Sequence, residues 1–160
     1  MPSRIPNPAL SVPGVLDALQ SLSKAAYEAA GQAGLPQSTV ELVNLRASQI
    51  NGCSVCLDMH ARGAKKAGES DERLFTLAAW RDTPYFTGAE RAALALAEAG
   101  TRLADRGEPV PDQVFDEAVA HYDEQALSAL IVCIAAINTW NRLNVMSDQE
   151  AGEWTAQWAD

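Results

Sequence analysis

Two cysteines, a histidine and a glutamate lie within one stretch of the sequence, between residues 41 and 60. Two residues separate Cys53 from Cys56, and His60 follows Cys56 by four positions. Because residues three and four apart share one face of an α-helix, the three side chains would project from nearly the same side of a helix. Two thiols within reach of each other can form and break a disulfide, and a nearby imidazole can move the protons. The spacing therefore predicts a reactive cluster.

The residues around this cluster predict a break between two helices. Asn51-Gly52 favours the end of a preceding helix, because both residues tolerate the left-handed backbone conformation. A new helix can then begin at Cys53, and we expect it to run to about Ala67 and to stop at Gly68. Thiols in the first turn of a helix face unpaired N–H groups and the positive end of the helix dipole, which favour the thiolate. This argument alone favours Cys53, the cysteine nearer the helix start, as the attacking thiolate.

The preceding helix is expected to start near Ser38 and is apolar around most of its circumference. Its polar residues form two narrow stripes, one of Glu41, Asn44 and Ser48 and the other of Arg46 and Gln49. A helix so apolar is largely buried, so one stripe is free to line a site. Glu41 has two interpretations. It completes a capping-box pattern with Ser38, and it could instead orient His60, as the third group does in a nucleophile, base and orienter arrangement.

The sequence predicts helices along the whole chain. Alanine, leucine and glutamate recur at helical spacing, so we predict an all-α fold, and 160 residues suit a single domain with its own core. Residues 1–12 contain three prolines and are expected to form an extended N-terminal arm, with the helical domain over residues 13–160. A capping box from Thr87 to Glu90 and a helix start at Asp123 begin later helices. The tail after residue 146 could add an amphipathic turn or two.

Composition restricts the location and the partners. The formal charge of −9, without a basic stripe, argues against a nucleic-acid partner. The N-terminus lacks the pattern of a secretory signal, and the run ALIVCIAAI is far shorter than the roughly 20 residues that span a bilayer. We therefore expect a cytoplasmic protein without a membrane partner. In a reducing compartment, a close cysteine pair indicates redox or metal chemistry.

The combination of Glu41, Cys53-x-x-Cys56 and His60 resembles the signature of the alkylhydroperoxidase D (AhpD) and carboxymuconolactone decarboxylase superfamily. The segments LAAWRDTPYFTGAERAALALAEAGT and AINTWNRLN are also similar to those of its small members, so the resemblance covers most of residues 15–145. It implies a single-domain AhpD-like helical bundle that assembles as a homo-oligomer, a trimer or a hexamer.

The resemblance also implies roles for the four residues. Cys56 would be the thiolate that attacks a hydroperoxide, Cys53 would resolve the sulfenic acid into a disulfide, and Glu41 and His60 would form the proton relay. The implied partners are a hydroperoxide substrate and an external dithiol of the thioredoxin or lipoyl type, and no bound cofactor or metal is required. This order of attack differs from the helix-dipole argument. We follow it because His60 lies one turn from Cys56. Val55 stands where some peroxidase members carry a histidine.

Other functions remain open from the sequence. The two thiols and His60 could hold zinc with Glu41 or Asp58 as a fourth ligand, although His121 and Cys133 are too isolated to supply a second ligand pair. The protein would then be a low-activity, redox-sensing or metal-binding oligomeric scaffold without turnover. A decarboxylating lyase is a third possibility, but the decarboxylases of the superfamily do not rely on a C-x-x-C pair. Cys133 itself is expected to be a packed core thiol.

Overall fold

The computed structural model describes residues 3–105, 107–152 and 155, and within these ranges it contains helices and no β-strand. The α-helices are α1 (Pro8–Ser11), α2 (Val15–Gln32), α3 (Gln37–Asn51), α4 (Ser54–Lys66), α5 (Asp71–Thr76), α6 (Gly88–Thr101), α7 (Asp112–Val119) and α8 (Glu124–Met146). Two 3-10 helices, η1 (Leu77–Asp82) and η2 (Leu103–Asp105), flank α6. The predicted all-α class is confirmed.

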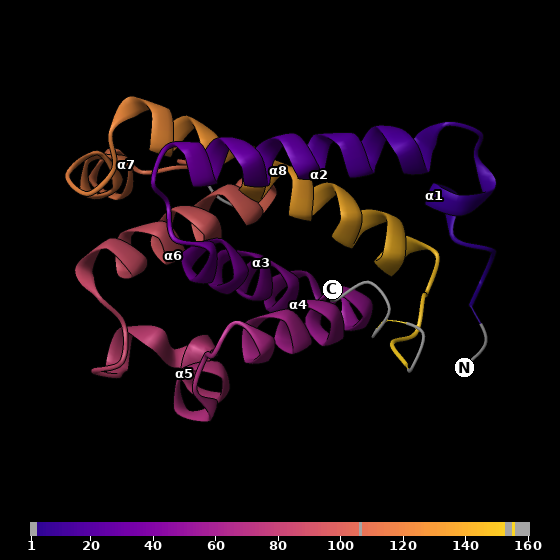
Figure 1. The fold of residues 1–160 in the computed structure, drawn as a ribbon, viewed down its shortest axis with the longest axis horizontal. Coiled ribbons are helices and arrows are strands. Elements are labelled where there is room, and N and C mark those ends of the chain that lie inside the picture. The colour runs from indigo at the N-terminus through magenta and orange to yellow at the C-terminus, as the bar shows by residue number, and fades with distance from the viewer. Residues whose placement is uncertain (1–2, 106, 153–154, 156–160) are drawn as a thin grey trace.

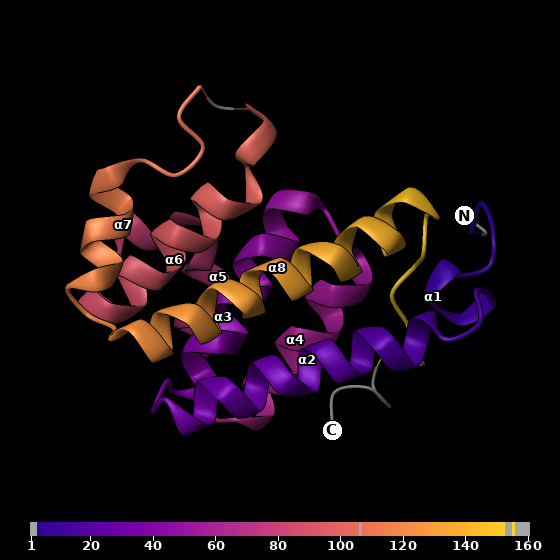
Figure 2. The same cartoon turned by 90° about the horizontal axis from the view of Figure 1, so that it is seen from above.

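Helix α3 lies at the centre of the bundle (Figure 1). It packs against α4, α6 and α8, while α2 runs alongside α8 in the opposite direction, as Figures 1 and 2 show. The largest apolar cluster joins α2, α3, α6 and α8. Most side chains of α3 are buried, including polar ones. Because a buried polar group without a hydrogen bond is costly, the polar stripes of α3 must find partners inside the protein.

The two stripes of α3 serve different contacts. In one, Arg46 Nε donates to Glu98 Oε1 at 2.6 Å, and Glu98 also accepts from Trp80 and Arg81 of η1. In the other, Glu41 and Asn44 face the site described below. The sequence predicted two stripes, and packing decided which one faces the site.

The breaks between helices follow the local signals that the sequence carries. Helix α3 ends at Asn51, and Gly52 adopts a left-handed conformation with φ of 68°. Cys53 is the N-cap of α4, and that helix ends at Lys66, just before Gly68 with φ of 92°. The capping box of Thr87 and the N-cap of Asp123 also form as predicted. The cysteine pair is therefore placed by backbone preferences that act over a few residues.

The N-terminal segment corrects the expectation of an extended arm. Residues Pro8–Ser11 form α1, and the Oδ1 of Asn7 accepts the N–H of Ala9 at 3.0 Å. An asparagine N-cap followed by a proline is a favourable helix start, and this local pairing explains the difference. Ala9 is only 1% exposed, and α1 lies beside the C-terminal end of α8 in Figure 2. The next helix, α2, begins at Val15.

Glu41 does not cap α3. The helix begins at Gln37 with Pro36 as N-cap, and the N-cap makes no side-chain hydrogen bond. This start places Ser38 inside the first turn, so the predicted box of Ser38 and Glu41 does not form. Glu41 is 7% exposed and is held by tertiary contacts instead. The local interpretation of this carboxylate was wrong.

Helix α8 is longer than the apolar run ALIVCIAAI within it. By length and composition alone its 23 residues could cross a membrane, although 56% of its most apolar window is buried inside the fold. The apolar run ALIVCIAAI is shorter than the helix because asparagines interrupt the apolar pattern toward the end of the helix. Helix α8 packs against both α2 and α3, as a core helix does. The helical turns expected in the tail after residue 146 would include Trp154 and Trp158, and both lie outside the described residues.

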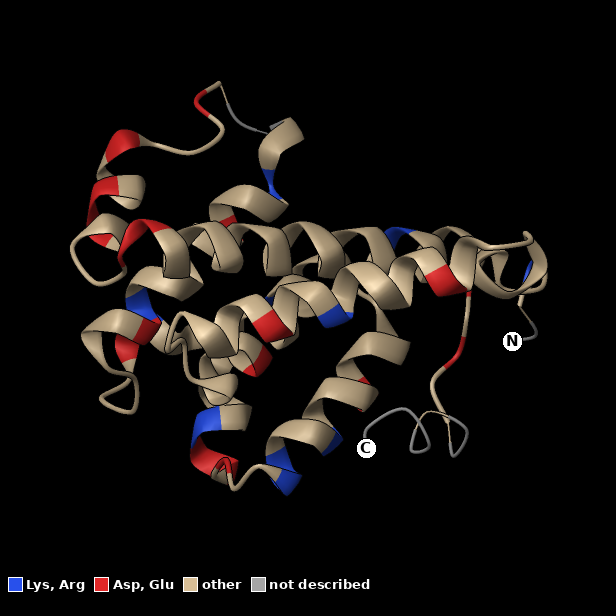
Figure 3. Cartoon of the chain, turned by 45° about the horizontal axis from the view of Figure 1, so that its top comes forward, with Lys and Arg blue, Asp and Glu red and all other residues tan. Residues whose placement is uncertain are grey.

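The charged side chains are unevenly distributed (Figure 3). Acidic residues gather over α7, which carries Asp112, Asp116 and Glu117. Basic residues lie toward the end of α4, where Arg62 pairs with Asp58 and Lys65 with Asp71. The acidic surface over α7 is therefore separate from the basic residues at the end of α4.

Candidate functional site

The cysteine pair occupies the junction of α3 and α4. Cys53 and Cys56 are both unpaired thiols, each 1% exposed, and they pack against Ala47, Val55 and Ile137. The Sγ of Cys53 accepts the backbone N–H of Cys56 at 3.4 Å, which is the contact of a sulfur N-cap. This position at the start of α4 directs unpaired N–H groups toward the sulfur and favours its ionised form.

Asn144 of α8 completes the surroundings of the two sulfurs. Its Nδ2 lies 3.4 Å from the Sγ of Cys56 and 3.8 Å from the Sγ of Cys53, in position to donate to either. Its Oδ1 accepts a hydrogen bond of 2.9 Å from the Nδ2 of Asn7. Sequence reasoning missed this residue. The available signal was a series of asparagines, three residues apart, at 138, 141 and 144 on the buried side of an apolar helix.

The two thiols have opposite pKa shifts. A hydrogen bond from the thiol of Cys56 lowers the pKa of Cys53 to about 7, against the opposing effect of burial. The same hydrogen bond, followed by burial, raises the pKa of Cys56 far above its usual value, because Cys56 holds the shared proton. The amides of Asn141 and Asn144 lower both values. The charge therefore rests on Cys53, in agreement with the helix-dipole argument, whereas the resemblance implies attack by Cys56.

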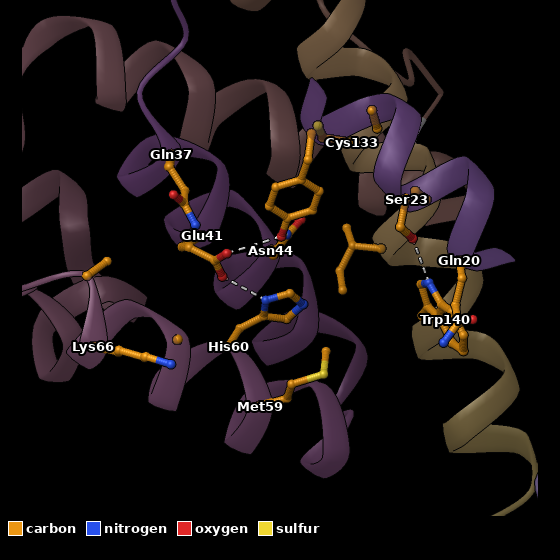
Figure 4. A pocket seen from close by; sticks show the side chains of 16 residues that line it. Gln20, Ser23, Gln37, Glu41, Asn44, Met59, His60, Lys66, Cys133 and Trp140 are labelled. Carbon is orange, nitrogen blue, oxygen red and sulfur yellow. Dashed lines mark hydrogen bonds and ion pairs between the residues drawn. The ribbon is translucent and has the colours of Figure 1, made fainter. Parts of the chain in front are cut away.

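Glu41 and His60 meet directly, as Figure 4 shows. The Nδ1 of His60 lies 2.7 Å from Oε2 of Glu41, and the hydroxyl of Tyr27 donates to Oε1 at 3.2 Å. Since an ionised carboxylate only accepts, this contact places the proton on Nδ1. Asn44 donates to the Tyr27 hydroxyl at 2.6 Å, and burial and the nearby carboxylate raise the pKa of Tyr27. Tyr27 therefore remains a donor, and Glu41 can hold the ring of His60 in one orientation.

His60 faces a cavity of about 630 Å³. Figure 4 shows its ring turned into this space, with Trp140 of α8 on the far side, bonded to Ser23. The walls are mainly apolar, and they come from Ala26, Met59, Ala67, Cys133, Ala136, Ile137 and Trp140. Cys133 is 2% exposed and packed in the core as expected, with a pKa raised to about 11 by burial, yet it also contributes to this wall. The volume is sufficient for an organic ligand.

Cys56 lines a different and smaller cavity of about 110 Å³. Cys53 lines neither space. Gln20, Met59 and Trp140 border both cavities, so they form the boundary between the thiol and the imidazole. Helical spacing predicted that all three side chains of the cluster share one face, but the packing of α2 and α8 against that face divides it. The structure pairs Glu41 with His60 and Cys53 with Cys56, and separates the pairs.

The zinc interpretation receives no support from the geometry. Within the described ranges, no three His, Cys, Asp or Glu side chains come together as a metal site requires. The Nδ1 of His60 is already engaged by Glu41, and Asp58 is bonded to Arg62 and Thr155.

Comparisons with known proteins identify the family of the chain. The sequence profile of the carboxymuconolactone decarboxylase family matches residues 13–99. The uncharacterised protein YdfG of Bacillus subtilis is 37% identical over 120 residues, which are 75% of this chain and 80% of YdfG. The alkyl hydroperoxide reductase AhpD of Bradyrhizobium diazoefficiens is 41% identical, but only over 46 residues, 29% of this chain and 25% of that protein.

A solved structure shows the same fold. ATU0492 of Agrobacterium tumefaciens is a protein of unknown function for which a role in antioxidant defence as an AhpD has been suggested. It superimposes with a TM-score of 0.83 and 34% identity, over 94% of this chain and 99% of its own. The two chains therefore share one architecture over almost their full lengths.

Proposed function

The chain belongs to the carboxymuconolactone decarboxylase family, and we propose that it is an AhpD-like, thiol-dependent peroxidase that reduces hydroperoxides. One observation carries the proposal. Cys53 and Cys56 lie side by side at the start of α4, where the backbone N–H of Cys56 donates to the Cys53 sulfur at 3.4 Å and Asn144 reaches both sulfurs. These donors favour a thiolate, and a hydrogen bond from Cys56 lowers the pKa of Cys53; the thiolate is the form that attacks peroxides.

The attack is assigned to Cys56, because its sulfur lines a cavity and that of Cys53 does not. The hydrogen bond between the sulfurs provides the route to ionise it, since the Cys56 proton can pass to the Cys53 thiolate. The Cys56 sulfur then attacks the outer peroxide oxygen, the O–O bond breaks, and the alkoxide takes up a proton and leaves as an alcohol. The Cys53 thiol attacks the resulting sulfenic acid and expels water. The hydroperoxide gains two electrons and the thiol pair becomes a disulfide.

Glu41 and His60 would supply the proton for the leaving alkoxide. Hydroperoxide would enter through the 630 Å³ cavity, and its peroxide end would pass between Met59 and Trp140 to reach Cys56. The departing oxygen would then lie on the His60 side. Glu41 keeps His60 Nδ1 engaged at 2.7 Å, so Nε2 is the atom available to the substrate. The ring would donate from Nε2 in its doubly protonated form, keep the Nδ1 proton that faces Glu41, and regain the Nε2 proton from water.

The partners follow from the same proposal. An external dithiol of the thioredoxin or lipoyl type would reduce the disulfide, as expected in the cytoplasm, and no bound organic cofactor or metal takes part. We also propose a homo-oligomer, either a trimer or a hexamer. Exposed apolar side chains support self-association, notably Leu22 at 41%, Ile131 at 44% and Val132 at 39% exposure.

The test is peroxide turnover by the purified, reduced protein. With tert-butyl hydroperoxide and excess dihydrolipoamide, we expect many peroxides reduced per chain. Mass spectrometry should show a reversible disulfide joining Cys53 to Cys56. If peroxide leaves both thiols intact, the proposal is wrong.

A second candidate function is a redox sensor without turnover. The observation that favours it is the 1% exposure of both cysteines, since a buried disulfide is slow to meet a reductant. Formation of the disulfide without repeated turnover would identify this function.

A further inference from the structure

Cys56 lies beside the N-terminal arm, of which the structure describes residues 3–12. Asn7, Ala9 and Leu10 of the arm line the 110 Å³ cavity together with Cys56. A dithiol reductant must reach one sulfur of a disulfide to attack it, and each sulfur is 1% exposed in the closed arrangement. The arm therefore lies on a path that the reductive half of the reaction has to use.

One side chain connects this arm to the sulfurs. Asn7 donates from Nδ2 to Oδ1 of Asn144 at 2.9 Å, and Asn144 donates in turn to Cys56 Sγ at 3.4 Å. Asn7 also caps α1 through its own Oδ1. A change at the sulfurs can thus reach the start of α1 through two hydrogen bonds.

Among the described residues, the arm is otherwise held by the packing of α1 against α2 and by contacts that lie mostly at the surface. Arg4 and Ile5 make backbone contacts with the segment after α8, through Ser147 and Gln149. The ion pair of Arg4 and Asp148 is 3.9 Å long, with side chains 70% and 50% exposed, and such pairs contribute little. Ile5, Leu10 and Val12 are each about half exposed or more. Apart from buried Ala9, the contact with Asn144 is the main interior attachment.

We propose that the arm is a redox-controlled lid, closed by the Asn7–Asn144 hydrogen bond while Cys53 and Cys56 are reduced and released when they form a disulfide. The inference rests on the proposed redox function of the pair. Release would expose the disulfide to the external dithiol, and closure after reduction would shield the thiols again.

The chemistry of oxidation provides the driving change. Closing the disulfide forms one S–S bond and removes two electrons from the sulfurs, which the hydroperoxide accepts as it becomes an alcohol and water. The pair loses its negative charge and its remaining thiol proton. A neutral disulfide sulfur is a far weaker acceptor than a thiolate, and the sulfurs must approach to about 2.05 Å. The Asn144 amide loses its acceptor, so its side chain turns away and Asn7 loses its partner.

The test is hydrogen–deuterium exchange of the full-length protein in both redox states. Diamide, which oxidises dithiols directly, closes the pair independently of any peroxidase activity. We expect the amides of residues 9–12 to exchange about two- to tenfold faster after oxidation, as loss of a hydrogen bond of ordinary strength allows, with α3 and α6 unchanged. Equal exchange of the arm in the reduced and disulfide forms would overturn the inference.

A matched variant tests the Asn7–Asn144 hydrogen bond by itself. Asn7→Ser keeps an acceptor for the N–H of Ala9 but is too short to reach Asn144. The reduced variant should exchange in the arm as fast as the oxidised native protein, and slow exchange would contradict the role of this contact. Arg4→Ala, which removes only the exposed ion pair, should exchange as the native protein does.

The two proposals fail in different ways. If diamide closes the disulfide and the arm stays protected, the lid is wrong and the peroxidase stands. If peroxide does not oxidise the pair but diamide releases the arm, the peroxidase is wrong and the lid stands. If neither oxidant closes the pair, both are wrong.

Discussion

The site has two halves that differ in how they are built. Glu41 and His60 lie in an open cavity of about 630 Å³, with their polar atoms held by α2 and α3. Cys53 and Cys56 lie in closed packing between the α3–α4 junction, α8 and the arm, beside only 110 Å³ of space. One half has room for a substrate, and the other protects reactive sulfurs. The comparison teaches that the proposed proton relay and the proposed redox pair are held by separate contacts, so each can be altered alone.

The largest effect is expected from removing the attacking sulfur. Cys56→Ser should abolish peroxide turnover, whereas Cys53→Ser should still consume one peroxide per chain and accumulate a sulfenic acid. Peroxide loss and trapping with dimedone measure these outcomes. The reverse pattern would assign the attack to Cys53, the sulfur with the lowered pKa.

Changes in the open half should slow the reaction without altering the thiols. His60→Ala and Glu41→Gln should each lower the rate about 10²–10⁴-fold, the usual contribution of a positioned acid or base. The thiolate titration, followed by ultraviolet absorbance, should not move. Cys133→Ala changes the wall of the same cavity without touching the dyad and serves as the control. A thiolate titration that moves in His60→Ala would show that the two halves are coupled.

The closed half should respond to pH through the cysteine pair. Since the pKa of Cys53 is lowered to about 7, the reaction rate should rise as pH increases through 7. Asn144→Leu removes a donor to both sulfurs, so the midpoint should move to higher pH and the rate at neutral pH should fall about three- to tenfold. An unchanged midpoint would mean that Asn144 does not stabilise the thiolate.

The same shift links pH to stability. A thiol pKa below its unfolded value means that the folded chain binds this proton less tightly. The lowered pKa of Cys53 therefore contributes stability that is lost as pH falls from the unfolded thiol pKa through about 7, whereas the raised pKa of Cys56 lowers stability as pH rises above the unfolded thiol pKa. Chemical denaturation across this range should show the loss in the native protein and a smaller one in Asn144→Leu.

The smallest effect is expected at Tyr27, whose hydroxyl donates to Glu41 in the open half. Tyr27→Phe removes the hydroxyl between Glu41 and Asn44, and should cost about 0.5–1.5 kcal/mol of stability. The rate should fall by less than it does in Glu41→Gln, with the thiolate titration unchanged. A loss of rate as large as that of Glu41→Gln would make Tyr27 a full member of the relay.

The sequence by itself determined the helical class, the break at Asn51-Gly52 and the position of Cys53 at a helix start. These features follow from backbone preferences and hydrophobic periodicity, which act between residues a few positions apart. The same local reasoning was wrong where tertiary packing competed with it. Glu41 matched a capping box, yet burial of α3 and the contact with His60 gave its carboxylate a different place.

Only the tertiary structure decided what surrounds the sulfurs and where the cavities lie. Asn144 is 91 residues from Cys53 along the chain, and Asn7 is 137 residues from Asn144. Contacts at such separations depend on how α8 packs against α3 and α4 and how α1 packs against α2, and no local pattern encodes that packing. The division between the His60 cavity and the Cys56 cavity arises in the same way, because Met59 and Trp140 come from different helices and meet only in the folded protein.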